Sequence, residues 1–481
     1  MEITESKYSN IYILFFSLLF ILANALVVYF FGAPYVAFAS FAFLILVIGI
    51  IAYDKLIYIV AFLTPLSLNL SYFIPNLPVD LSLFTEPLLL LILLIVTLKF
   101  AITRQLNLDV LKHPISIAII INLIWIAITT ATSTMPLVSF KFLLSRLWFV
   151  VPMFFVAISI FKDYSKIKPF LWAYGLSLVI IVIYSTYNLS QTSFLAQNAA
   201  HFVVKPFHKD HTIYGAATAL FAPVFLGLVF NKKNKPTIRI IAALFAFIIT
   251  IGVILSYSRA AWIGLVVATL VFVIIKLKIK FSYLLITAVV TISLVSIFWF
   301  QIIDTLEKNR QDTSSNLSEQ IMSITNISTD ASNKERLNRW YCAIQMFKEK
   351  PITGWGPGTY QFQYAPFQLK RMKTIISTDF GDVGNAHSEY LGPMAEQGVM
   401  GLISILILFT SIIVTGLRVV RNADNKEIKT LALFITLGFV TYIVHGFMNN
   451  FLDQDKIAVP FFGLAAILAS LDIYHKHNSS L

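Results

Sequence analysis

The chain has 481 residues, of which 58% are hydrophobic and only 12% are charged. This composition, with a mean hydropathy of +0.80, excludes an ordinary soluble globular protein and indicates a polytopic membrane protein. The single cysteine, Cys342, excludes an intrachain disulfide and a thiolate metal cluster.

Apolar runs close to the ~20 residues that a helix needs to cross a bilayer recur along the whole chain. They lie at about 11–31, 33–52, 55–70, 83–102, 114–133, 137–161, 168–188, 211–230, 236–257, 258–277, 281–300, 399–419, 427–447 and 455–474. The run at 55–70 is short and contains Pro65. The pattern predicts an all-α integral membrane protein with about 12 to 14 transmembrane helices.

Lysine and arginine are concentrated in alternate loops, as expected when flanking cations are retained in the cytoplasm. With the N-terminus inside, the cytoplasmic loops hold Lys55, Arg104, Lys112, Lys162, Lys166, Lys168, Lys232, Lys233, Lys235, Arg239, Lys276, Lys278, Lys280, Arg418, Arg421, Lys426 and Lys429. The opposite short loops hold little beyond Lys205, Lys209, Arg259 and Lys456. Both termini are therefore expected in the cytoplasm.

Topology accounts for much of the net charge of +12, and no nucleic-acid partner is needed. The opening MEITESKYSN lacks a cleavage pattern, so the first run is read as a retained span.

One long polar segment interrupts the apolar runs and divides the chain into 1–300, 301–398 and 399–481. The topology places residues 301–398 outside the cytoplasm as one large loop. Residues 311–333 are rich in Ser, Thr, Asn and Asp, which predicts flexibility. Leu337, Trp340, Tyr341, Ile344, Met346 and Phe347 recur at helical spacing and predict an amphipathic helix over 335–349, followed by the turn-rich "GWGPG".

The loop ends on "GNAHSEYLGPMAEQGVMG", which places a histidine just before an apolar run. Asn385 is a candidate N-cap, so His387 is expected in the first turn of a helix, where the macrodipole would keep its ring neutral. A neutral ring can accept a proton; the alternative is a helix-capping histidine at the membrane interface. Gly398 and Gly401 would permit close approach of another helix or of a lipid-linked ligand.

Two cations lie inside the apolar run "VSFKFLLSRLWFV". Snorkelling explains Lys141 near the outer end. Arg146 lies about five residues deeper, where a cation is costly, and is expected to face a polar cavity in which it would bind a lipid phosphate.

Several other titratable side chains are candidate site residues. His201, His208 and His211, with Asp210, match no compact ligand spacing, so no metal site is predicted. His445 suits either a satisfied core position or a cavity wall. Glu389 and Glu396, seven residues apart, are expected to share a helix face toward water.

Four segments resemble the bacterial O-antigen ligase and O-antigen polymerase superfamily. His387-Ser388, nine residues, Gly398, two residues and Gly401 resemble its histidine motif. "YSRAAWIG", with Arg259, resembles its "SRGA" segment, although Ala260 stands where a glycine is common. "RLNRWYCAIQMFKEKPITGWGPGTYQF", with Arg336, resembles its loop segment, and "KDHTIYGAATALFAPVFLGL", from Lys209, resembles the preceding loop and span.

The resemblance implies a metal-independent, cofactor-free glycosyltransferase with a GT-C-like helical fold in the bacterial inner membrane and an active site facing the periplasm. Its partners would be an undecaprenyl-pyrophosphate-linked glycan, membrane lipids and an acceptor, either lipid A-core or another glycan. Arg259 and Arg336 would clamp the diphosphate, with Arg339 as the competing choice for the second position. His387 would act as the base, or instead bind the pyrophosphate. Asp210 and His211 would line the acceptor entrance.

O-antigen ligase is the leading interpretation, and two related activities stay open: an O-antigen or exopolysaccharide polymerase, and a protein O-oligosaccharyltransferase. A lipid or solute transporter is the alternative from another class. A transporter has no need of a large outer loop with histidine, arginine and glycine motifs, and the chain shows no repeated halves.

Overall fold

The computed structural model describes residues 54–70, 82–104, 107–194, 197–279, 331–369, 373 and 384–477, with a few residues between 19 and 30. Within these residues the fold is helical, and an isolated bridge between Asn69 and Ser82 is the only strand-like pairing. The predicted spans at 33–52 and 281–300, and most of the one at 11–31, lie outside the described residues, as does nearly all of the predicted flexible segment.

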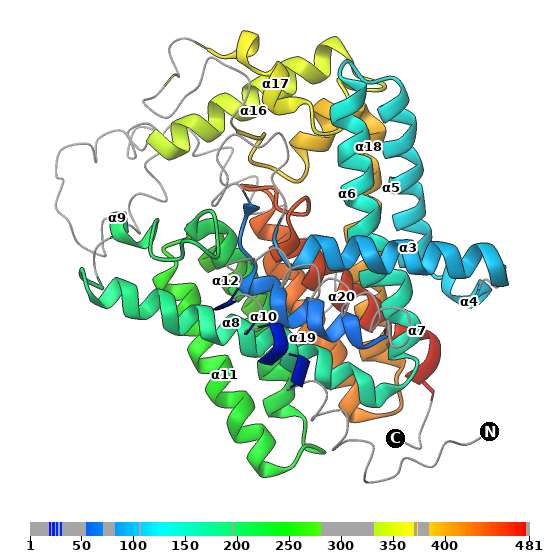
Figure 1. Cartoon of the computed structure of the whole chain (residues 1–481), viewed down its shortest axis with the longest axis vertical. Coiled ribbons are helices and arrows are strands. Elements are labelled where there is room, and N and C mark those ends of the chain that lie inside the picture. The colour runs from blue at the N-terminus through cyan, green and yellow to red at the C-terminus, as the bar shows by residue number, and fades with distance from the viewer. Residues whose placement is uncertain are drawn as a thin grey trace.

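Ten helices among the described residues are long and apolar enough to cross a membrane (Figure 1). They are α3 (Thr85–Thr103), α5 (Pro114–Ala131), α6 (Pro136–Val150) with the π-helical turn Val151–Val156 and α7 (Ala157–Phe161), α8 (Ile167–Ser190), α10 (His211–Phe230), α11 (Pro236–Leu255), α12 (Arg259–Lys276), α18 (Leu391–Asn422), α19 (Lys426–His445), and α20 (Asp455–Ser470) with the π-helical turn Leu471–His475. The chain is thus an all-α polytopic membrane protein, as predicted. Residues 54–66, in the run expected to be short, are helical, and the residues directly before them are not among those described.

The remaining helices connect and cover these spans. They are α4 (Leu108–Leu111), the 3₁₀ turn Tyr164–Lys166, α9 (Gln197–Ala200), α16 (Ala331–Glu349), α17 (Tyr360–Gln363) and the 3₁₀ turn Ala365–Phe367.

Local sequence sets where the spans begin. Proline occupies the first helical position of α5, α6 and α11, where its missing N–H costs nothing. Asp210 caps α10, its Oδ1 accepting from the backbone amides of Thr212 at 2.7 Å and Ile213 at 3.0 Å. Asn425 caps α19 in the same way.

The core gathers around α10 and α20, whose side chains are almost all buried. Gly438 of α19 lies against α10, since an added Cβ would come within 2.5 Å of the Leu220 carbonyl oxygen. At the start of α20, Lys456 is buried and its Nζ donates to the carbonyl oxygens of Thr64 at 2.6 Å and Ser67 at 2.7 Å. Lys456, counted above as an outer-loop cation, therefore ties α20 to the end of the helix at 54–66.

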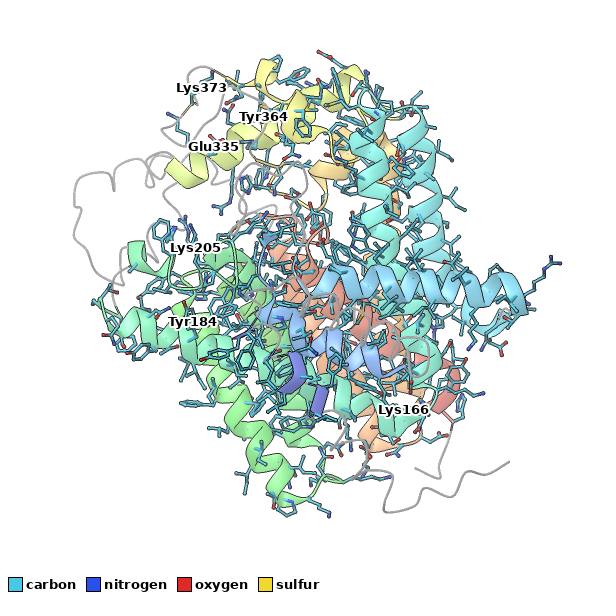
Figure 2. The ribbon with its side chains drawn as sticks, in the orientation of Figure 1. Lys166, Tyr184, Lys205, Glu335, Tyr364 and Lys373 are labelled. Carbon is cyan, nitrogen blue, oxygen red and sulfur yellow. The ribbon has the colours of Figure 1, made fainter. Side chains whose placement is uncertain are left out.

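Residues 331–369 of the large loop form a cap, called the loop cap below, at one end of the molecule. α16 and α17 lie near the ends of α5 and α6 (Figure 1), and Glu335 and Tyr364 of this cap are far from Lys166 at the opposite end (Figure 2). The predicted helix over 335–349 is confirmed as α16. Its predicted apolar face is wrong in part, because Ile344 is exposed while the buried face includes the ion pair of Glu335 and Arg339.

The glycine-rich turn after α16 is interlocked with the start of α18. Gly398 has φ 70° and ψ −165°, which kinks α18, and the backbone amide of Val399 donates to the Pro351 carbonyl at 2.9 Å. On the other side of the kink, the Gly356 amide donates to the Glu396 carbonyl at 2.7 Å. Thr134, between α5 and α6, holds the same turn by donating to the Trp355 carbonyl. These contacts fix the segment that carries His387 relative to the membrane spans.

Candidate active site

A polar cavity of about 1160 Å³ lies where the loop cap meets the ends of the spans. Its walls come from α3, α5, α6, the start of α10, the turn at 358–362, residues 384–397 and the segment 449–456 before and at the start of α20. Four of the residues predicted for the site line it: Lys141, Arg146, Asp210 and His387. The cavity is large enough for several sugar residues or for a drug-sized ligand.

His387 stands in the cavity wall before the helix, and its predicted place in the first helical turn is wrong. Its backbone has φ 49°, a left-handed conformation that histidine adopts rarely. Asn385 Oδ1 accepts from the His387 amide at 3.0 Å, whereas α18 begins at Leu391 and is capped by the Ser388 hydroxyl. The indole of Trp340 donates to the His387 carbonyl at 3.3 Å.

The environment of His387 keeps its ring neutral, for a reason other than the predicted macrodipole. Burial, together with the charges of Arg336 and Arg339, lowers the pKa of His387 to about 3, against the smaller opposing effects of Asp210 and Asn449. An anion bound beside the arginines would offset their charge and make the ring more basic.

A cationic cluster adjoins His387. Arg259 is the first residue of α12, and Arg336 lies in the first half of α16. Both charges act on His211 at the start of α10, and Arg336 acts on His387 as well. Neither arginine is among the described residues that line the polar cavity. His387 therefore lines the cavity and also lies within reach of the charge of Arg336, which does not line it.

Packing of small residues brings the start of α12 close to α10. An added Cβ on Gly215 would lie 2.7 Å from Ser258 Cβ, so only glycine leaves room for this approach. The side chain of Ser258 does not cap α12, and its hydroxyl lies 3.4 Å from Nε2 of the buried His445. The first amides of α12 thus add their positive end to the cluster.

Arg146 is buried in the cavity wall, as its depth in the apolar run suggested. Its Nη1 donates to the Leu452 carbonyl at 2.9 Å, and its charge acts on Asp453. Burial raises the pKa of Asp453 while Arg146 lowers it. Lys141, one helical turn away on α6, is exposed at the same cavity.

The prediction that Glu389 and Glu396 face water is wrong, because both carboxylates accept backbone hydrogen bonds from distant segments. Glu389 Oε1 accepts from the Tyr442 hydroxyl at 2.5 Å and from the amides of Phe451 at 2.6 Å and Leu452 at 2.9 Å. Burial raises the pKa of Glu389. Glu396 accepts from the amides of Gly358 and Tyr360.

Three residues predicted to bind substrate, Arg339, Gly398 and Gly401, instead contact neighbouring parts of the protein. Arg339 is buried, pairs with Glu335 at 2.7 Å and lies 4.0 Å over the Tyr364 ring. Gly398 meets the Ile352 carbonyl, so it admits the neighbouring turn and not a ligand. Gly401 likewise packs against the Pro393 carbonyl of its own kinked helix.

The stretch "MNNFLDQD" between α19 and α20 supplies cavity residues that the sequence reasoning passed over. Asn449, Asn450, Asp453 and Gln454 line the cavity. Asn449 Nδ2 and Asn450 Oδ1 are buried without a hydrogen-bond partner, and the same holds for Gln397 Oε1 on α18. The sequence signal for these residues is the cluster of polar side chains between two apolar runs, which is where a membrane protein would line a cavity.

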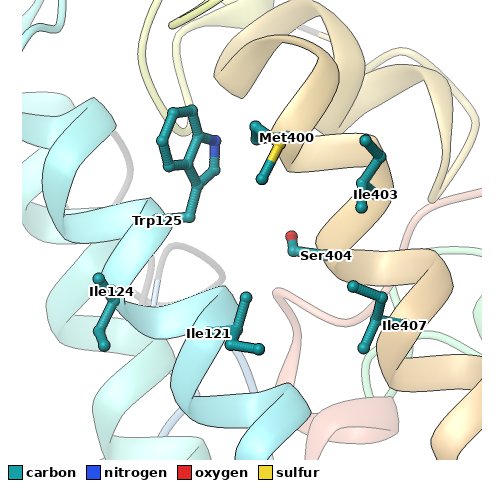
Figure 3. A pocket seen from close by; sticks show the side chains of 7 residues that line it. All are labelled: Ile121, Ile124, Trp125, Met400, Ile403, Ser404 and Ile407. Atoms are coloured by element: carbon teal, nitrogen blue, oxygen red, sulfur yellow. The ribbon is translucent and has the colours of Figure 1, made fainter.

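A second, smaller pocket of about 170 Å³ lies between α5 and α18 (Figure 3). Its walls are apolar apart from the Ser404 hydroxyl, which accepts from Asn122 of α5 at 2.9 Å. Asn122 also lines the polar cavity, so this contact separates the two pockets.

Histidine and acidic groups gather in places without forming a metal site. The rings of His201 and His211 lie 3.9 Å apart, and both nitrogens of the buried His208 lack a hydrogen-bond partner. No cluster of three or more His, Cys, Asp or Glu side chains suited to a metal ion occurs among the described residues.

Comparison with known proteins places this geometry in a family. No significant match was found among curated proteins. Residues 243–406 match the family model described as O-antigen ligase, a range that includes Arg259, Arg336 and His387 and extends into α18. Arg146, His211 and the stretch at 449–456 lie outside the match. Residues 243–406 are thus similar to the O-antigen ligase family.

Proposed function

We propose that the protein transfers a glycan from an undecaprenyl-pyrophosphate donor to an acceptor hydroxyl at the periplasmic face of the inner membrane, most simply as an O-antigen ligase acting on lipid A-core. The observation that carries the proposal is the position of His387. The histidine lines a polar cavity, the charge of Arg336 acts on it, and the family match covers it.

The cationic cluster suits the leaving group. Charge grows on the diphosphate oxygens as the glycosidic bond breaks, and fixed cations stabilise that charge. Arg259 and Arg336 supply planar donors that stay protonated, and the uncapped start of α12 supplies backbone amides. In this proposal the arginines take the role that a divalent cation plays elsewhere, so transfer proceeds in EDTA.

The polar cavity suits the acceptor. Amide and carboxyl side chains line it beside Phe142, Trp148 and Tyr360, a mixture that pairs hydroxyl groups and stacks on sugar rings. A hydroxyl held there faces His387, whose neutral ring takes the proton as the oxygen attacks the anomeric carbon. A diphosphate in the cationic cluster would raise the basicity of that ring, so donor binding would prepare the base.

The test uses purified protein, a polyprenyl-diphosphate-linked oligosaccharide and lipid A-core, with EDTA present throughout. Formation of glycosylated lipid A-core with release of polyprenyl diphosphate is expected. Failure to transfer to any acceptor would reject the glycosyltransferase proposal, and activity that appears only with added Mg²⁺ or Mn²⁺ would reject the arginine clamp.

A deletion strain separates ligase from polymerase. Loss of the whole lipopolysaccharide ladder, with lipid-linked polymer accumulating, is the ligase result. Core carrying a single repeat is the polymerase result and would overturn the choice of lipid A-core as acceptor.

A further inference from the structure

We propose that Asn449 and Glu389 are positioning residues for His387: Asn449 orients the imidazole, and Glu389 holds the loop that carries Asn449. The proposal rests on the role of His387 given above and adds two residues to it. Asn449 lies outside the matched range 243–406, and Glu389 is one of the nine unspecified residues within the histidine motif.

His387 needs an orienting partner because a base must present one ring nitrogen to the acceptor hydroxyl. The backbone is held through Asn385 and Trp340, which fixes where the side chain begins. Asn449 lines the same cavity, on the loop that Glu389 holds against the His387 segment, and its amide is the neutral side-chain group that acts on the ring. Arg336 and Arg339 from α16, and Asp210 before α10, act on it through charge.

The chemistry of Asn449 fits this task. An amide oxygen that accepts from one ring N–H selects a tautomer and leaves the lone pair of the other nitrogen available to a substrate proton. The amide is neutral, so it orients the ring without adding a charge. Asn449 is buried and its Nδ2 has no hydrogen-bond partner, so the oxygen is the atom left to pair with His387.

Glu389 joins the two segments that meet at this contact. Its backbone amide donates to the Gly446 carbonyl at 2.8 Å, and its Oε1 accepts from the amides of Phe451 and Leu452. Both ends of the loop that carries Asn449 are therefore tied to a residue two positions from His387. Gly446 lies so close that an added Cβ would be 3.1 Å from Glu389 Cγ.

The same loop carries the contact on to the deeper cavity wall. Leu452 makes both contacts. Its amide donates to Glu389 Oε1, and its carbonyl accepts from Arg146 Nη1 at 2.9 Å. Displacing this loop would move the partner of His387 and the carbonyl that holds Arg146 together. A shift of about 1 Å at a reacting group costs on the order of 100-fold in rate.

The experiment measures turnover against pH, with kcat and KM for donor and acceptor, on purified wild type and four variants. Asn449→Ala should lower kcat on the order of 100-fold with little change in donor KM. Asn449→Asp adds a carboxylate beside the ring, which favours the imidazolium and should move the acid limb of the pH profile upward by about one unit or more.

Glu389 is tested by rescue. Glu389→Gln keeps an oxygen that can accept the same three hydrogen bonds and should retain most of the activity, whereas Glu389→Ala leaves two amides and a hydroxyl unpaired and should reproduce the kcat loss. Monodisperse elution in detergent checks folding, and the Asp and Gln variants keep the test decisive if an alanine variant does not fold.

The outcomes separate this inference from the proposed function. If wild-type protein does not transfer glycan, the proposed function fails. If wild type is active and Asn449→Asp leaves the pH profile unchanged, Asn449 does not orient His387. If Glu389→Gln loses as much kcat as Glu389→Ala, the backbone clamp is rejected.

Discussion

Glu396 Oε2 accepts a hydrogen bond from the backbone amide of Gly358 at 3.0 Å, although the two residues are 38 positions apart. The contact ties the glycine turn after α16 to the first part of α18, on the side of the kink at Gly398 that faces the loop cap. The two motifs around these residues thus form one structural unit that places His387.

The first prediction concerns this kink. Gly398→Ala places a Cβ within 2.1 Å of the Ile352 carbonyl oxygen at a backbone conformation that only glycine adopts easily. The free energy of unfolding should fall by at least about 2 kcal/mol, measured by thermal unfolding in detergent. Gly392→Ala on the same helix is the control, since its Cβ would make an ordinary 3.7 Å contact with Ala386 Cβ. Equal melting temperatures for the two variants would contradict this account.

The sequence predicted the spans because each is a long apolar run, and it predicted α16 because its apolar residues recur at helical spacing. The conformation at His387 was out of reach. An asparagine side chain accepts from the backbone amide two residues later both when it caps a helix and when it closes a turn. Asn385 closes a turn that precedes the helix, and the sequence does not distinguish the two cases. Ser388 is the residue that caps α18.

The burial of Glu389 could not be predicted for a different reason. Its partners, Tyr442, Phe451 and Leu452, lie 53 to 63 residues further along the chain, and two of them act through backbone amides that no side-chain pattern reveals. Acids beside a membrane span are usually solvated, so periodicity alone assigns them to water.

The second prediction concerns orientation. A periplasm-active reporter fused after Glu349 at the end of α16 should be active, whereas one fused after Lys233, between α10 and α11, should be inactive. A cytoplasm-active reporter at the same two positions should give the reverse. If the fusion after Glu349 reads as cytoplasmic, the candidate site faces the wrong compartment for a periplasmic acceptor.

The third prediction concerns the shape of the cation at the start of α12. Arg259→Lys keeps the charge and loses the planar pair of donors, so kcat/KM for donor should fall at least about tenfold. Arg239→Lys is the matched control and should leave kcat/KM unchanged, because Arg239 lies in the first turn of α11 and donates to the Val229 carbonyl at the opposite end of α10 from the cluster. Full activity of Arg259→Lys would mean that a point charge is sufficient at this position.

The fourth prediction is a dependence of stability on pH. Burial and the nearby arginines lower the pKa of His387 to about 3, whereas an unfolded histidine titrates near ~6.5. Below ~6.5 the unfolded state takes up a proton that the folded state does not, so the contribution of His387 to stability is lost as pH falls. By pH 5 this loss amounts to at most about 2 kcal/mol.

Melting temperatures of wild type and His387→Gln, compared at pH 7.5 and pH 5, measure this contribution. Wild type should lose more stability than the variant over this interval, because glutamine does not titrate. His208, whose pKa burial also lowers, is present in both proteins and cancels in the comparison. Equal losses would show that His387 titrates normally in the folded protein.

The most direct test of the account compares donor affinity with turnover in His387→Ala and Arg336→Ala. A base acts on the acceptor proton and contributes little to holding the diphosphate, so His387→Ala should abolish transfer while binding of the polyprenyl-diphosphate donor stays near the wild-type value. Arg336→Ala should weaken donor binding and transfer together. If His387→Ala loses donor affinity as severely as Arg336→Ala, the histidine is a phosphate ligand and the assignment of the base is wrong; near-normal turnover of His387→Ala would reduce its role to structure alone.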